Sequence, residues 1–305
     1  MRRTHSFLRI PVFWLFLALS LWTAQPGMDS QARVSANVAA SVSFDQGVYT
    51  YSYVVANQPD SREEVSTIEL DVTLSDAAMQ LPSTGLEPGA GMLTALSSAL
   101  GSLPEAVRIT PVALSAPSGW VGTTTRRGHV LWGAVSTNEF IQPSSTRDGF
   151  VLKSTGLPAI RQVRLGGYLD VDTSGLAPPE DGGADLDRYK LELDALRAAL
   201  SIVSYTVGPS APPANFGASE LLRDLINARD QTLRLGWIRN RGLENSLQVK
   251  LEAAVASLAR NNEGAAIEQL NAFVNEVTAQ AGKGLSDEAA ALLKFNALYL
   301  LTLMS

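Results

Sequence analysis

The chain of 305 residues contains no cysteine and only two histidines, and each scarcity excludes a class of chemistry. Without cysteine there is no thiol nucleophile, no thiolate metal site and no disulfide. His5 lies in an N-terminal segment that we expect to be removed, so a Ser-His-Asp triad would depend on His129 alone. His129 follows Arg126 and Arg127 and precedes an apolar stretch, a setting typical of an exposed residue at a strand start. The sequence therefore predicts no catalytic residue, no bound cofactor and no enzyme.

Positive charge is also scarce, and this excludes nucleic acid as a partner. The formal net charge is -6 at pH 7, and the basic runs are limited to the pairs Arg2/Arg3 and Arg126/Arg127. Binding to phosphates requires a basic field, which this chain lacks. No Gly-x-Ser-x-Gly or phosphate-loop pattern occurs either. Paired carboxylates that meet only in the fold stay open as a hydrolytic alternative.

The N-terminus has the pattern of a secretory signal peptide. Arg2, Arg3 and Arg9 precede an apolar run over 10–24, which is shorter than the roughly 20 residues that a membrane-spanning helix needs. Cleavage after Ala24 or after Ala32 would remove it, so residues 1–32 are assigned to the signal segment. We expect a secreted or periplasmic protein with no integral membrane anchor after cleavage.

The first half of the mature chain has the period of β-strands. Tyr49, Tyr51 and Tyr53 alternate with Thr50 and Ser52, which places three rings on one face of a strand. These rings are core candidates, and an aromatic platform for sugars is the alternative. Further strand patterns cover 68–74, 130–135, 150–153 and 163–171, with a short helical insertion expected at 89–103. Short strands with Gly, Pro, Ser and Thr spacers predict an antiparallel β-sandwich over 33–175.

The second half changes to helical period. We expect a linker over 176–215 with one amphipathic helix, whose apolar positions continue to Val203, and a stiff connector at 211–214. Beyond it, apolar positions predict four helices at 219–235, 243–260, 265–281 and 287–303, with Ser286 capping the last. The last segment is apolar on nearly every side, which predicts a buried central helix. The fold class is thus multi-domain α+β, an antiparallel β-sandwich followed by a small all-α helical bundle over 216–305.

This last third resembles the FIMAH domain, a small helical module. The resemblance lies in the stretches 235–238, 242–247, 250–251, 265–267, 270–277 and 282–285. The region is also similar to the C-terminal part of a class of exported bacterial proteins in which Val207-Gly208-Pro209 precedes the helices. The resemblance implies an extracellular accessory module and carries no catalytic residues over. The N-terminal part is similar to β-sandwich domains of bacterial exoproteins.

One acidic stretch has the spacing of a calcium loop. Asp170, Asp172 and Ser174 stand at positions one, three and five, glycine at six, and Asp181 at twelve. Two prolines in the second half of this loop and an aspartate in place of the last glutamate argue against calcium. A solvated strand end followed by linker is the reading that we favour.

The chain has a signal-peptide pattern and two foldable modules, and its sequence shows no set of catalytic residues. These observations predict a secreted, non-catalytic binding or structural protein of the bacterial cell envelope or exterior. Its partner would be a surface polymer or another protein. An extracellular hydrolase that uses carboxylates or a bound cation is the alternative.

The export prediction can be tested with Leu17→Arg, which places a charge in the middle of the apolar run. We expect the precursor to stay in the cytoplasm, which fractionation and immunoblotting would measure. Unchanged recovery of mature protein outside the cytoplasm would show that 1–32 is not a signal peptide.

Overall fold

The computed structural model describes residues 33–72, 113–125, 129–168, 184–212 and 217–304. Three features expected from the sequence lie outside these residues. They are the signal segment 1–32, the helical insertion at 89–103 and the calcium-loop pattern from Asp170 to Asp181 with Asp172 and Ser174.

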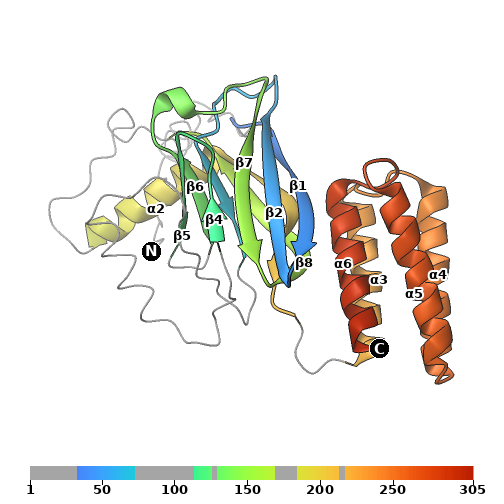
Figure 1. Ribbon diagram of the computed structural model, residues 1–305. Helices are drawn as coiled ribbons and strands as arrows, with labels where there is room; N and C mark the ends of the chain where they lie inside the picture. The colour runs from blue at the N-terminus through green and yellow to red at the C-terminus, as the bar shows by residue number, and fades with distance from the viewer. Residues whose placement is uncertain (1–32, 73–112, 126–128, 169–183, 213–216, 305) are drawn as a thin grey trace, which may run out of the picture. The chain divides into compact units, whose positions relative to one another are not determined.

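Nine strands of the described residues form two antiparallel sheets, which confirms the predicted β-sandwich (Figure 1). The four-stranded sheet has the order β1-β2-β7-β4, and the five-stranded sheet has the order β5-β6-β3-β8-β9. Their bounds are β1 (Ala36–Asp45), β2 (Val48–Asn57), β3 (Thr67–Leu70), β4 (Ala113–Ser115), β5 (Trp120–Thr124), β6 (Val130–Ala134), β7 (Ser145–Ser154), β8 (Leu157–Gly166) and β9 (Ser201–Ser210).

The core between the sheets is built from the alternating apolar positions of the strands. Tyr49, Tyr51 and Tyr53 are 8%, 0% and 1% exposed, so the three rings fill the interior. The alternative of an aromatic platform on these rings is therefore wrong. Phe150 on β7 packs edge-on against Trp120, with ring centroids 5.0 Å apart. Such aromatic pairs add to the stability that burial of their area supplies.

Strand β9 is the main difference from the expected linker over 176–215. Helix α2 (Ala184–Ala199) ends before it, and residues Ser201–Ser210 pair with β8 along its whole length. The apolar spacing of Leu196, Leu200 and Val203 is helical, so the sequence predicts a helix where this strand begins. Its β-branched residues favour the extended conformation, and Pro209 is tolerated because β9 is an edge strand. The sandwich therefore extends to Ser210.

Four helices follow at the predicted places: α3 (Ala218–Arg234), α4 (Arg241–Ala259), α5 (Glu263–Gln280) and α6 (Asp287–Leu303). Ser286 caps α6 as expected, since its Oγ accepts the backbone N–H of Ala289 at 3.2 Å. The centre of the bundle includes Leu247, Leu270 and Phe273, each 0% exposed. Among the described helices, none combines the length and the apolar character that a membrane crossing requires.

Helix α6 is apolar on opposite sides because it belongs to two cores. Ala289, Leu293 and Leu300 pack in the helical core. Leu292 and Phe295 pack in the core of the sandwich, where the Phe295 ring meets Tyr49 edge-on at a centroid distance of 5.3 Å. The predicted buried helix is thus confirmed, and its second apolar face is covered by the sandwich.

A buried carboxylate joins the same helix to the edge of a sheet. Strand β1 is the outer strand of the four-stranded sheet, and the backbone N–H of Ala40 donates to Oε1 of Glu288 at 2.7 Å. Glu288 is 7% exposed and lies in the first turn of α6, where the helix dipole favours negative charge. An exposed sheet edge is prone to pair with other chains, and here a helix covers it.

We expect Glu288→Ala to lower the free energy of unfolding by about 1–3 kcal/mol, because the buried N–H of Ala40 loses its acceptor. Glu288→Gln keeps an acceptor oxygen and should lose less. Glu268→Ala, at an exposed site of α5, is the matched control and should change stability by less than about 0.5 kcal/mol. Denaturant unfolding measures all three, and equal stability of Glu288→Ala and the control would contradict this role.

Candidate binding cavity and the His129 cluster

A cavity of about 390 Å³ lies where the sandwich meets the helices. One wall is the start of β8 with the end of β9, and the other walls are α3 and α6. Its volume falls in the range of small-molecule sites, which occur preferentially at junctions between domains. We call it the junction cavity. Its described lining residues are Leu157, Pro158, Ala159, Ile160, Ser210, Ala211, Leu221, Asp224, Leu225, Asn227, Ala228, Gln231, Leu292, Asn296 and Tyr299.

Helix α3 supplies the polar side of the junction cavity. Asp224, Asn227 and Gln231 line it and are exposed, and their spacing of three and four residues places them along one stripe of the helix. Ala228 lies on the same stripe, and its small side chain leaves space between its polar neighbours. The stripe next to it carries Leu222 and Arg229, which are buried in the bundle. One face of α3 is therefore left to the junction cavity.

Asn296 fixes α6 to β8 at the wall of the cavity. Its Nδ2 donates to the carbonyl oxygens of Pro158 at 2.8 Å and of Leu292 at 2.7 Å. Both amide hydrogens of this side chain are thereby used, and the acceptor Oδ1 remains for other contacts. The carbonyl oxygen of Pro158 therefore already accepts a hydrogen bond from α6.

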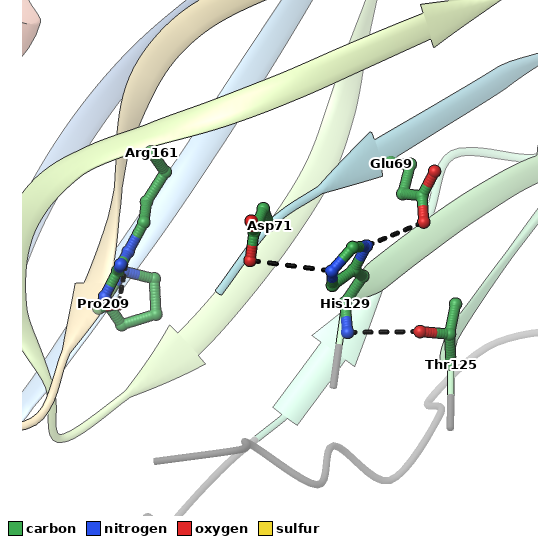
Figure 2. A network of polar contacts seen from close by, with 6 residues as sticks. All are labelled: Glu69, Asp71, Thr125, His129, Arg161 and Pro209. Carbon is green, nitrogen blue, oxygen red and sulfur yellow. Dashed lines mark hydrogen bonds and ion pairs between the residues drawn. The ribbon is translucent and has the colours of Figure 1, made fainter. Parts of the chain in front are cut away.

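Arg161 holds the end of β9 in the same region. Its Nε and Nη2 donate to the carbonyl oxygen of Pro209 at 3.0 and 2.6 Å (Figure 2). Burial lowers the pKa of Arg161, and the charge of Asp71 acts in the opposite direction. Gly208 gives the stem of Arg161 its space, because a Cβ there would lie 3.0 Å from Cγ of Arg161. The two hydrogen bonds from Arg161 thus fix Pro209, and with it the neighbouring Ser210, at the edge of the cavity.

His129 lies in a separate polar cluster at the start of β6. Its Nδ1 is 2.7 Å from Oε1 of Glu69, which is on β3. Its Nε2 is 3.6 Å from Oδ1 of Asp71, which directly follows β3. Figure 2 shows the imidazole between the two carboxylates, and the backbone N–H of His129 donates to Oγ1 of Thr125 at 3.1 Å. The histidine side chain is 22% exposed, so this strand-start residue is more enclosed than the sequence indicates.

The placement of the imidazole between two carboxylates differs from that of a catalytic dyad. A histidine that activates a hydroxyl nucleophile needs one ring nitrogen for the hydroxyl and one for an orienting carboxylate. In His129 both nitrogens face carboxylates. Within the described part of the chain, no group of three or more acidic or histidine side chains is arranged to hold a metal ion.

One comparison with known proteins concerns the helices that form two walls of the junction cavity. Residues 222–302 match the family model of the FIMAH domain. The resemblance expected from the sequence is thereby confirmed, and we call these residues the FIMAH region. An uncharacterized protein from Nocardia farcinica, described as having an immunoglobulin-like fold, is similar at 12% identity. That likeness covers 48% of this chain and 88% of that chain, with a TM-score of 0.26. No curated protein matches the chain.

The junction cavity was not expected from the sequence, although two signals for it exist. The FIMAH region contributes Asn296, the one amide side chain of the mostly apolar helix α6, and such a residue indicates a polar partner. It also contributes the polar stripe of α3 with Asp224, Asn227 and Gln231 beside an apolar face. Neither signal shows which surface the polar groups meet, because that depends on contacts with β8. The residues of the calcium pattern, Asp170, Asp172, Ser174 and Asp181, lie outside the described residues.

Proposed function

We propose that this is a secreted, non-catalytic binding protein of the bacterial cell envelope or exterior, and that the junction cavity holds its ligand. Three observations support the proposal. The N-terminus has a signal-peptide pattern, the C-terminal helices match the FIMAH domain, and a cavity of small-molecule size lies between sandwich and helices. The cavity is the observation that carries it.

The composition of the junction cavity supports binding. Apolar side chains such as Ile160, Leu225 and Leu292 line it, and a few polar groups from α3, α6 and β9 converge on it. Polar and apolar surface contribute to the lining in similar share. In small-molecule sites the apolar walls bury the ligand and the polar groups fix its orientation.

The walls of the cavity are held in place before any ligand arrives. Asn296 ties α6 to β8, Glu288 ties it to β1, and Arg161 ties β8 to the end of β9. A preformed site loses little conformational entropy on binding, which favours affinity. The two modules thus act as one binding unit, in which the helices complete a site that the sandwich alone cannot form.

Hydrolysis by carboxylates remains the alternative function. Glu69 and Asp71 are the acidic pair that the described residues bring together with a histidine. Glu69 is hydrogen-bonded to Nδ1 of His129, and Asp71 stands 3.6 Å from Nε2, the nitrogen that a nucleophile or an attacking water would need. Binding is therefore the better account of the described residues.

The proposal is tested by blocking the junction cavity. Gln231→Trp places a large ring at the cavity wall, and Asn271→Trp is the matched control at an exposed position of α5. Wild type and both variants are screened by thermal shift with neutral oligosaccharides, acidic oligosaccharides and peptides. A compound present at about one hundred times its Kd stabilises a protein by about 2.7 kcal/mol, which raises the melting temperature by several degrees.

We expect at least one compound class to stabilise wild type and the control but not Gln231→Trp, with no compound consumed. Stabilisation that survives Gln231→Trp would contradict the cavity as the site. Turnover of a glycosidic, ester or peptide substrate, abolished by Glu69→Gln, would contradict the non-catalytic function.

A further inference from the structure

We propose that the ligand of the junction cavity is the end of a neutral saccharide chain. This inference rests on the proposed function, because it names the ligand class of the same site.

The charge of the cavity disfavours anions. Asp224 is the one charged side chain among the described lining residues, and no lysine or arginine is among them. Arg161 is buried, with 5% of the residue exposed, and its guanidinium donates to the carbonyl of Pro209, so it offers no anion contact. A carboxylate, sulfate or phosphate would meet only the like charge of Asp224. The groups of the ligand that enter the cavity are therefore not anionic.

The polar lining groups match hydroxyl groups. Asn227, Gln231 and Asn296 carry side-chain amides, and Ser210 carries a hydroxyl. A sugar hydroxyl both donates and accepts, so the amides of Asn227 and Gln231 can bind it in either role. Asn296 offers its Oδ1 as an acceptor, because its Nδ2 donates to Pro158 and Leu292. The ring of Tyr299 and the aliphatic wall with Ile160 and Leu225 offer apolar surface for the C–H faces of a sugar ring.

The backbone at the wall disfavours a peptide. An extended peptide binds by adding main-chain hydrogen bonds to a strand edge. At this end of the sheet Pro158 is paired with Pro209, and neither has an N–H group. Their carbonyl oxygens already accept from Asn296 and Arg161. Recognition there must come from side chains, which suits a saccharide.

The test is calorimetric titration of the mature chain with cellotetraose, maltotetraose, N,N′,N″,N‴-tetraacetylchitotetraose, tetragalacturonate and an uncharged capped tetrapeptide. We expect at least one neutral tetrasaccharide to bind, with tetragalacturonate at least about tenfold weaker. Asn227→Ala and Gln231→Ala should each lower the affinity about tenfold by loss of one hydrogen bond, whereas Asn271→Ala leaves it unchanged. All three positions are exposed, so the variants should fold, which circular dichroism checks.

Other outcomes overturn the inference in distinguishable ways. Binding of only the peptide or of only tetragalacturonate, weakened by Gln231→Ala, would refute the neutral saccharide and leave the proposed function standing. Saccharide binding that neither variant weakens would refute the cavity as the site, and with it both proposals. Absence of binding by every neutral saccharide would refute the saccharide class.

Discussion

The contact of α6 with the sandwich is the constraint on which the rest of the structure depends. Strand β1 ends one sheet, and the N–H of Ala40 points out of that sheet to the carboxylate of Glu288. Without a partner this buried donor would cost free energy, and an open edge would invite pairing with other chains. Phe295 and Leu292 add apolar burial beside this hydrogen bond. The helix therefore closes the sandwich while it remains part of the bundle.

This contact also creates the junction cavity. Once α6 lies against β1 and β8, helix α3 is placed opposite the end of the sandwich, and the space between them is the cavity. Its volume of about 390 Å³ is left open because small or polar residues, among them Ala228 and Asn227, stand on the facing stripe of α3. The same interaction thus protects a sheet edge and forms a site, so stability and the proposed binding share one origin.

Much of the fold could be predicted from local sequence pattern. The helices follow from apolar period and caps such as Ser286, and the strand with Tyr49, Tyr51 and Tyr53 follows from alternation, because both signals lie within one segment. Strand β9 could not be found in this way, since its sequence continues a helical pattern and the strand is specified by pairing with β8. The cavity has the same origin in distant contacts.

The candidate site was predictable only in fragments. The sequence shows a polar interruption at Asn296, but the partner of its amide, the carbonyl of Pro158, is 138 residues away. It shows a histidine at a strand start, but not that Glu69 and Asp71 enclose its ring. Local period reveals which face of an element is apolar, whereas it does not reveal which element covers that face.

The most direct test of the central claim is native-state hydrogen exchange as a function of denaturant. If α6 and the sandwich form one cooperative unit, the amide hydrogens of α6 and that of Ala40 on β1 should exchange through the same opening. They should then share one free energy and one denaturant dependence. Exchange of the α6 amides through a smaller opening, while Ala40 stays protected up to global unfolding, would contradict the account.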